Sequence, residues 1–407
     1  MAGMVIIGGG LAAGTAAETL RSEGYEGGIT VVADEAHTPY QRPPLSKGFL
    51  KGDEGLDAVI LHPDDWYREQ RIDVRSSTSA TAIHPDAHTV DLDDGTQLSY
   101  DKLLLATGSS PRVLPIPGHD LPGVHMLRRL DDSEALKAEL SGGGKKLVLI
   151  GSGWIGMEVA ATARQLGNDV VILERDPVPL AVALGEEMGN VFRRLHEQNG
   201  IDLRTSVNVE RIEGDDRATG VVVDGQTVPA DLVLIGVGAI PNTKLAEDAG
   251  IEVDHGILTD ASLRTSAADV FAAGDVANAV HPALGQRLRS EHWANALNAG
   301  PVAAKAMLGQ DVAHDMIPYF YTDQFDLGME LSGFPPLMAD AELVIRGDLE
   351  TREFIAFWTQ GARVVGGMNV NIWDVNEIVQ QLIRSGAGVD PRALADESVP
   401  LEGLVAA

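Results

Sequence analysis

The sequence predicts an α/β fold with two doubly wound, Rossmann-like units and a C-terminal α+β domain. A glycine-rich pattern occurs twice, as Gly8-Gly9-Gly10-Leu11-Ala12-Ala13-Gly14 and as Gly151-Ser152-Gly153-Trp154-Ile155-Gly156. Each copy follows a short apolar run and opens a helix-like stretch, and an acidic residue follows the next apolar run. Two such copies predict two dinucleotides, which suits electron transfer between a flavin and a nicotinamide.

The first unit begins at the N-terminus. We expect a strand over residues 4–10, a helix over 11–23 and a second strand over 29–33. The proline-rich stretch 39–47 is predicted to be an ordered loop or a helix start, because proline is excluded from strand and helix interiors. Residues 87–99 alternate around an Asp-Asp-Gly turn and predict a hairpin.

The first glycine pattern has the chemistry of a dinucleotide site. Gly8 permits a tight turn, Gly10 lets the backbone approach a pyrophosphate, and Ala13 keeps the helix close to the sheet. The helix N-terminus then presents N–H groups to the phosphates. Asp34 and Glu35, after the second strand, can accept hydrogen bonds from the adenosine ribose.

The second unit is predicted from about 145 to 240, with a strand over Asp169–Leu173 that ends at Glu174. A carboxylate there bonds the ribose 2′-hydroxyl of NADH and repels the 2′-phosphate of NADPH, so we favour NADH. The neighbouring Arg175 could attract that phosphate, but we interpret it as a solvated surface charge.

Further apolar runs complete the predicted organisation. Buried strands are expected at 103–106 and 270–273, and the proline-rich stretch 111–123 is expected to connect domains. Aromatic residues concentrate after 318, and strands are predicted at 343–347, 353–358 and 362–370. The chain therefore divides at this connector and again near residue 318, where a separate α+β domain is predicted.

Composition excludes several classes of function. The net charge of −29 over 407 residues disfavours nucleic-acid binding. The chain has no cysteine, which excludes disulfides, protein-ligated iron–sulfur clusters and a redox-active dithiol. We expect no metal site. No apolar run approaches the ~20 residues of a membrane span, and no signal peptide is visible, so a cytoplasmic protein is expected.

Four blocks of sequence resemble one family along essentially the whole chain. They are Tyr40-Gln-Arg-Pro-Pro-Leu-Ser-Lys47, Ala106-Thr-Gly-Ser-Ser-Pro-Arg112, Phe271-Ala-Ala-Gly-Asp275 and Glu291-His-Trp-Ala-Asn295. They resemble the FAD-dependent NADH:ferredoxin reductases that serve bacterial cytochromes P450 and Rieske-type dioxygenases. The resemblance implies a glutathione-reductase-like fold, FAD and NADH as cofactors, and a 2Fe–2S ferredoxin as partner of a monomer or homodimer. The domains that it implies are an FAD-binding domain (1–113 and 242–317), an NAD-binding domain (114–241) and a C-terminal α+β domain (318–407).

The resemblance also implies roles for individual residues. Lys47 would lie near the flavin N5 and pair with Glu158, and these two form the catalytic prediction. Asp275 would hold a ribityl hydroxyl. The predicted FAD-binding residues are Gly8, Gly10, Leu11, Ala12, Ala13, Asp34, Glu35, Arg42, Lys47, Ala106, Thr107, Gly108, Arg112, Gly274, Asp275, Glu291, His292 and Trp293. The predicted NAD-binding residues are Gly151, Gly153, Trp154, Ile155, Gly156, Glu158, Glu174, Arg175, Val237 and Gly238. Arg287, Arg289 and Trp293 are the residues predicted to dock the partner.

Two positions depart from the family pattern. Relatives often carry a Trp-x-Trp pair where this chain has Tyr319-Phe320-Tyr321, and some carry an arginine where this chain has Val182. Other acceptors stay open, namely rubredoxin and monodehydroascorbate, as does a flavin-bound signalling or interaction protein. A membrane quinone reductase is disfavoured, because the C-terminal stretch is too weak an anchor.

Overall fold

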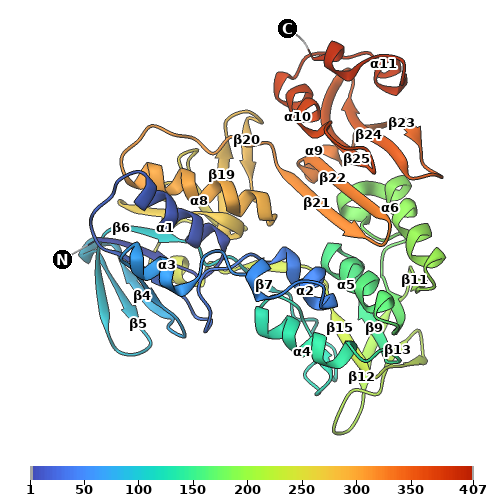
Figure 1. The fold of residues 1–407 in the computed structure, drawn as a ribbon, viewed down its shortest axis with the longest axis horizontal. Helices are drawn as coiled ribbons and strands as arrows, with labels where there is room; N and C mark the ends of the chain where they lie inside the picture. Colours follow the sequence, from blue (N-terminus) through green and yellow to red (C-terminus); the bar gives the residue numbers. More distant parts are fainter. Residues whose placement is uncertain (1–2, 406–407) are drawn as a thin grey trace. The chain divides into compact units, whose positions relative to one another are not determined.

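The computed structural model describes residues 3–405, which fall into two compact units (Figure 1). The first unit contains the chain up to Arg42, Leu56–Ser110 and Ile240–Pro318. The second contains Pro43–Gly55, Pro111–Ala239 and the chain from Tyr319 onward. Within the described residues, no helix is long and apolar enough to cross a membrane.

The first unit is built on one mixed sheet. Its strands are β1 (Gly3–Ile7), β2 (Ile29–Val32), β3 (Ile72–Arg75), β4 (Ala80–His84), β5 (Thr89–Leu92), β6 (Gln97–Leu105) and β18 (Val270–Ala272). The order is β3-β2-β1-β6-β5-β4, and β18 pairs with β6. The pairs among β3, β2, β1, β6 and β18 are parallel, whereas β4, β5 and β6 pair antiparallel.

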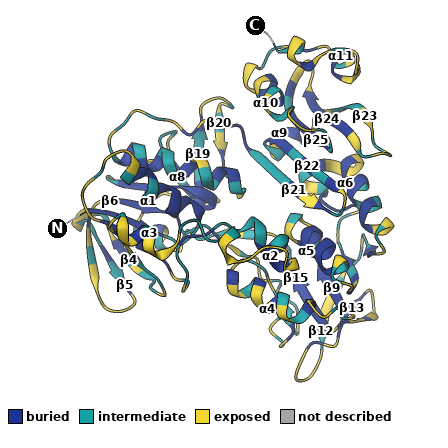
Figure 2. Ribbon diagram, in the orientation of Figure 1, coloured by how far each residue is buried: buried dark blue, intermediate teal, exposed yellow. Residues whose placement is uncertain are grey.

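Helices α1 (Leu11–Ser22) and α8 (Trp293–Met307) pack against each other on this sheet. Every residue of β1 is buried, as expected for a parallel strand covered on both faces. Gly300 allows the close helix contact, because a Cβ there would lie 2.2 Å from the hydroxyl oxygen of Thr15. The alanine-rich faces of α1 and α8 form a continuous core with the sheet, drawn dark blue in Figure 2.

The rest of the first unit is formed by short elements. They are α3 (Asp64–Glu69), α7 (Lys244–Asp248) and a small sheet of β17 (Ile257–Thr259), β19 (Ala277–His281) and β20 (Gln286–Leu288). Strands β7 (Ser109–Pro111) and β16 (Ala239–Pro241) span positions where the chain passes from one unit to the other.

The second unit contains a parallel sheet in the order β11-β10-β9-β15-β8. Its strands are β8 (Val124–His125), β9 (Lys146–Ile150), β10 (Asp169–Leu173), β11 (Asp202–Arg204) and β15 (Leu232–Ile235). The accompanying helices are α2 (Gly48–Lys51), α4 (Leu130–Leu140), α5 (Trp154–Gln165) and α6 (Ala181–Gln198). A separate antiparallel sheet is made of β12 (Val209–Glu213), β13 (Gly220–Val223) and β14 (Gln226–Pro229).

The C-terminal part of the second unit is an antiparallel sheet in the order β21-β22-β25-β24-β23. Its elements are β21 (Tyr319–Gln324), β22 (Leu327–Gly333), α9 (Pro335–Met338), β23 (Glu342–Asp348), β24 (Glu353–Gln360), β25 (Arg363–Val370), α10 (Asn376–Ser385) and α11 (Pro391–Ala395). Helix α10 packs on β25 and β22. One hydrophobic cluster joins this sheet to α5, α6 and β9, so these elements share a core.

The observed ends of several strands can be compared with the predicted ones. The strand predicted over 4–10 ends at Ile7, because Gly8 turns the chain with φ +133°. The strand predicted over 103–106 is the end of the longer β6, and the hairpin over 87–99 is confirmed by the antiparallel pairing of β5 with β6. The strands β23, β24 and β25 agree with the C-terminal predictions to within two residues.

Candidate functional site

The first glycine turn is shaped so that only glycine fits at its start. A Cβ on Gly8 would lie 2.1 Å from the carbonyl oxygen of Ala106 on the neighbouring strand. A Cβ on Gly10 would lie 2.8 Å from Nη1 of Arg42. Gly10 is also the N-cap of α1, and no side chain within the described part of the chain caps this helix. The first N–H groups of α1 are therefore left for a phosphate, which fits a pyrophosphate at this turn.

Glu35 and Arg42 meet beside this turn. The Glu35 carboxylate accepts from the Tyr40 hydroxyl at 2.6 Å and from Arg42 Nη2 at 3.2 Å. The Arg42 guanidinium also stacks 5.0 Å from the centre of the Tyr40 ring. Asp34 is exposed. Of the two acids predicted to bind the ribose, Glu35 is thus held by neighbours, while Asp34 faces outward.

Asp275 lies in the turn after β18. It is 8% exposed, and its carboxylate accepts a hydrogen bond of 3.0 Å from the hydroxyl of Ser109. Gly274 has φ +77° there, and a Cβ on it would lie 3.1 Å from the Cβ of Ala12 in the first turn of α1. The sequence therefore brings two of its predicted FAD motifs, around Ala12 and around Asp275, to one place in the first unit.

The Ala106-Thr107-Gly108 block is fixed through Asn242. The Thr107 hydroxyl donates to the Asn242 carbonyl at 2.9 Å, and the Asn242 amide donates to the Thr107 carbonyl at 2.8 Å. Asn242 also accepts from the Ser110 hydroxyl. Asn242 was not predicted from the sequence, and its position after Pro241 carries no motif that would have identified it.

The second glycine turn repeats the geometry of the first. Gly151 has φ +99°, and a Cβ there would lie 2.5 Å from the carbonyl oxygen of Gly236. A Cβ on Gly156 would lie 2.8 Å from the carbonyl oxygen of Gly151, so the helix approaches the turn closely. Gly153 begins α5, and no side chain caps that helix. This turn fits a second pyrophosphate.

Glu174 follows β10 and reaches back to this turn. Its Oε2 accepts from the backbone N–H of Ser152 at 2.8 Å and from the Ser152 hydroxyl at 2.6 Å, and its Oε1 accepts from the backbone N–H of Asp176. Arg175 has an 87% exposed side chain that lies 3.5 Å from the Asp176 carboxylate. The carboxylate that is predicted to select NADH is thus fixed, while the neighbouring arginine points into solvent.

The other residues that were predicted to bind NAD differ in how exposed their side chains are. Ile155 is 47% exposed, whereas the Trp154 ring packs against Phe192 and Phe320 in the core of the unit. The Trp154 ring therefore packs in the core, and only the backbone of this residue belongs to the turn. The Val237 side chain lies against Gly151.

Arg112, which was predicted to bind FAD, contacts Gly238 through its backbone. Its backbone N–H donates to the Gly238 carbonyl at 2.9 Å. Arg112 thus neighbours a residue predicted to bind NAD.

Lys47 and Glu158 form a buried ion pair. Lys47 Nζ lies 2.6 Å from Glu158 Oε1, with the two side chains 18% and 3% exposed. Lys47 also stands 5.5 Å from the centre of the Tyr321 ring. The predicted pairing of these two residues is therefore present, although they lie 111 positions apart in sequence.

Two hydroxyls missed by the sequence reasoning complete this site. Ser46 Oγ donates to Glu158 Oε2 at 2.5 Å, and Thr322 Oγ1 donates to Glu158 Oε1 at 2.7 Å. Ser46 lies in the proline-rich block directly before Lys47, so its position in the sequence could have identified it as a site residue. Thr322 stands in an ordinary strand pattern and had none.

Burial changes the titration of groups around this pair. Burial, with Glu158, Asp323 and Glu54 nearby, raises the pKa of Tyr321 to about 12. Burial also raises the pKa of Asp323, while Lys47 opposes that shift. The tyrosines that stand where relatives often carry tryptophans are therefore neutral at physiological pH.

The segment predicted to dock the partner lies at the start of α8. Trp293 Nε1 donates to Gln41 Oε1 at 3.0 Å. Arg289 forms an ion pair with Glu291, and Arg287 donates to the Thr259 and Asn278 carbonyls. The charge of Arg289 is thus compensated locally. Burial lowers the pKa of His292 to about 4, so its ring is neutral at pH 7.

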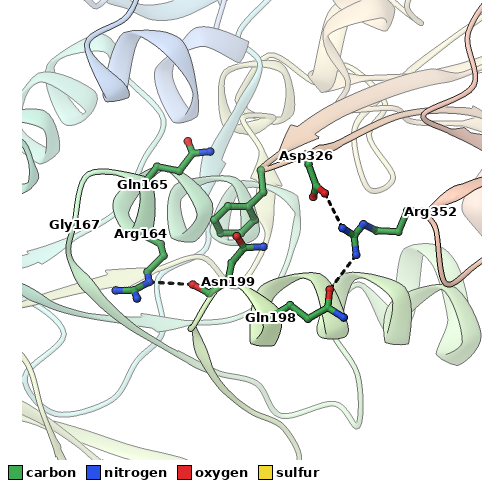
Figure 3. A pocket seen from close by; sticks show the side chains of 8 residues that line it. Arg164, Gln165, Gly167, Gln198, Asn199, Asp326 and Arg352 are labelled. Atoms are coloured by element: carbon green, nitrogen blue, oxygen red, sulfur yellow. Dashed lines mark hydrogen bonds and ion pairs between the residues drawn. The ribbon is translucent and has the colours of Figure 1, made fainter.

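A polar pocket of about 760 Å³ opens in the second unit (Figure 3). It is lined by Arg164, Gln165, Gly167, Gln198, Asn199, Phe325, Asp326 and Arg352. Its guanidinium groups are engaged, since Arg352 donates to Gln198 and Asp326, and Arg164 donates to the Asn199 carbonyl. This lining includes none of the residues predicted for either dinucleotide.

Two glycine turns that each follow a parallel strand, a fixed carboxylate after β10 and a buried lysine–glutamate pair are typical of oxidoreductases that bind two dinucleotides. The chain belongs to the pyridine nucleotide-disulphide oxidoreductase family, whose model matches residues 3–300, and a reductase C-terminal model matches 319–405. It is an oxidoreductase whose family membership implies FAD and NADH. With no cysteine, it lacks the disulfide that gives the family its name.

The chain is similar to known reductases along its whole length. Rhodocoxin reductase of Rhodococcus erythropolis is 36% identical over 99% of this chain and 94% of that protein. The ferredoxin–NAD(+) reductase component of an anthranilate 1,2-dioxygenase system from Burkholderia cepacia is 38% identical over 98% of each. A crystal structure of a covalent putidaredoxin reductase–putidaredoxin complex matches with a TM-score of 0.95 at 34% identity, covering 99% of this chain and 98% of that one. These matches confirm the resemblance and the fold class.

Proposed function

We propose that this protein is an NADH-dependent ferredoxin reductase that supplies a cytochrome P450 or a Rieske-type dioxygenase through a 2Fe–2S ferredoxin. The observation that carries the proposal is the pair of glycine turns without a side-chain cap, each following an inner strand with parallel neighbours, β1 or β9. When bound, FAD supplies the chemistry that accepts a hydride and releases electrons one at a time. The similarity to reductase components of oxygenase systems supports the choice of acceptor.

We assign FAD to residues 1–113 with 242–317, NADH to 114–241 and a C-terminal domain to 318–407. In the first turn, Gly8 and Gly10 admit the phosphates and Arg42 adds positive charge. Asp275 offers a carboxylate fixed by Ser109 to a polyol hydroxyl. In the second turn, Glu174 accepts from the adenosine ribose.

Lys47 and Glu158 act as a unit in this proposal. Lys47 supplies a positive charge to the flavin, which favours reduction electrostatically. Glu158 keeps that ammonium group in one place, because it is itself buried and held by two hydroxyls. We propose the cytoplasm as the location, since NADH is the reductant.

Different acceptors would use the same flavin site. The lack of cysteine excludes transfer through a protein dithiol. Rubredoxin and monodehydroascorbate reduction are the enzymatic alternatives, and a flavin-bound signalling protein is the alternative from another class. The signalling alternative predicts slow NADH oxidation and a persistent charge-transfer complex in place of turnover.

The test is an anaerobic NADH titration of the purified flavoprotein, followed by addition of a 2Fe–2S ferredoxin. Bleaching of the flavin absorption and then rapid ferredoxin reduction is the expected result. Flavin that stays oxidised with excess NADH would overturn the proposal. Bleaching without ferredoxin reduction would direct the search to rubredoxin or monodehydroascorbate.

A further inference from the structure

Behind the Lys47–Glu158 pair, a row of buried polar side chains continues away from the site. Thr322 Oγ1 is 3.1 Å from Gln324 Nε2, and Gln324 Oε1 is 2.8 Å from Nε2 of His196. Thr322, Gln324 and His196 are each at most 1% exposed. They come from β21 and from α6, far from Glu158 in sequence but within the same unit. Such a row is costly to bury unless every member is satisfied.

The carboxylate at one end fixes the direction of every bond in the row. The Glu158 carboxylate is paired with the Lys47 ammonium group and accepts hydrogen bonds, so the single hydroxyl proton of Thr322 must point to it. Thr322 can then only accept from Gln324, which turns the amide N–H₂ of Gln324 toward Thr322 and its carbonyl oxygen toward His196. His196 must therefore donate from Nε2. The orientation of the Gln324 amide and the tautomer of His196 both follow from the negative charge of Glu158.

The far end of the row agrees with this direction. His196 Nδ1 is buried and has no hydrogen-bond partner among residues 3–405, which an unprotonated ring nitrogen tolerates but an N–H group rarely does. Burial lowers the pKa of His196 to about 4, so the ring carries one proton at neutral pH. Its other face packs edge-on against Phe325, with ring centres 5.4 Å apart.

We propose that His196, Gln324 and Thr322 form a one-way hydrogen-bond chain that orients the Glu158 carboxylate, which makes His196 a positioning residue for the Lys47–Glu158 pair. The chain leaves Glu158 Oε1 shared by one hydroxyl and one ammonium group, while Ser46 holds Oε2. All three contacts together set a single carboxylate orientation. This inference rests on the proposed function only for its consequence on flavin reduction.

The hydroxyl of Thr322 is the link to remove. Thr322→Val keeps the side-chain shape, and Thr322→Ser restores the hydroxyl. In stopped-flow mixing with NADH, we expect the limiting rate of flavin reduction to fall about tenfold in Thr322→Val, the effect of about one charge-assisted hydrogen bond. The apparent NADH dissociation constant should change less than twofold, and Thr322→Ser should recover most of the rate. Thr359→Val, which also removes a buried hydroxyl from the same sheet, is the matched control.

A second pair of variants probes the far end. His196→Leu removes the donor, whereas His196→Gln can keep one, so the rate should fall in the first and be largely restored in the second. Folded Thr322→Val with wild-type rates would overturn the proposal. Equal losses in all variants, including Thr359→Val, would also overturn it, because they would reflect packing alone.

A spectroscopic measurement tests the chain without catalysis. In ¹⁵N-histidine-labelled holoprotein at pH 7, the His196 resonances, assigned by their loss in His196→Gln, should show the neutral tautomer with the proton on Nε2. A proton on Nδ1, or a doubly protonated ring, would contradict the inference. If wild-type flavin were not reduced by NADH, the proposed function would fail while this tautomer result would still stand or fall by itself.

Discussion

The Glu174 carboxylate binds both the backbone N–H and the hydroxyl of Ser152, at 2.8 and 2.6 Å. One acid thus connects the strand end to the glycine turn and is fixed before a ribose arrives. In the proposed NADH site, such preorganisation would favour selectivity, because the carboxylate could not move away from a 2′-phosphate.

Replacing Glu174 should weaken discrimination between the two nicotinamide cofactors. In Glu174→Ala, the loss of a charge-assisted hydrogen bond should lower kcat/KM for NADH by roughly tenfold. The value for NADPH should rise, because the repulsion is gone. Steady-state kinetics with both cofactors measures this ratio. Arg175→Ala serves as control, since that side chain is 87% exposed and should leave the NADH value unchanged. An unaltered ratio in Glu174→Ala would show that another group selects the cofactor.

Breaking the Lys47–Glu158 pair from one side should destabilise the fold. Lys47→Met leaves a 3% exposed carboxylate without its cation, which costs about 3 kcal/mol in free energy of unfolding. The double variant Lys47→Met with Glu158→Gln should regain part of that loss. Urea denaturation of the four members of this cycle gives the coupling energy. A coupling energy near zero would argue against an interacting buried pair.

Buried neutral histidines should make stability depend on pH. The pKa values of His196 and His314 are lowered to about 4 by burial, below the unfolded value of 6.5. Between these values the unfolded chain binds more protons than the folded one, so stability is complete above about pH 6.5 and decreases as the pH falls toward 4. Each ring contributes a slope of up to about 1.4 kcal/mol per pH unit.

Urea midpoints between pH 5 and pH 8 measure this dependence. His314→Asn should flatten the slope in that range by the share of one ring. His255→Gln is the comparison, because its side chain is 94% exposed and should leave the slope as it is. An unchanged slope in His314→Asn would mean that other groups cause the acid sensitivity.

The ion pair of Arg289 with Glu291 gives a charge prediction for partner docking. If an acidic ferredoxin approaches this face, Glu291→Gln should lower its KM at low salt by releasing the arginine charge, and Arg289→Glu should raise it. Both effects should diminish at high ionic strength, since exposed charges are screened. Ferredoxin reduction rates at two salt concentrations give the KM values that test this prediction. Two variants with the wild-type KM would remove Arg289 from the docking surface.

Local patterns in the sequence predicted the local structure well. The strand at Asp169–Leu173 agrees residue for residue, because a continuous apolar run between polar ends defines a buried parallel strand. The strand predicted to end at residue 10 was too long, because apolar content alone does not show where a positive φ turns the chain. Both glycine turns were predicted correctly, because the glycines that such a turn requires lie close together in the sequence.

The contacts between distant residues could not be predicted in the same way. The pairing of Lys47 with Glu158 came from family resemblance, whereas Thr322 and His196 had no local signal. Their role depends on strand β21 lying beside α5 and α6, which is a matter of tertiary packing. A buried threonine in a strand looks the same in sequence whether or not a carboxylate lies opposite.

The division of the chain also constrains the order in which the protein can be made. Strand β18 at Val270–Ala272 pairs with β6, and α8 covers the sheet that β1 begins. A nascent chain emerging from the ribosome therefore holds an incomplete first sheet while the whole of the Pro111–Ala239 segment is being synthesised. Until then, the apolar face of α1 has no permanent cover and is open to chaperones or to aggregation. A chain that ends at residue 240 should accordingly be insoluble, even though it contains both glycine turns.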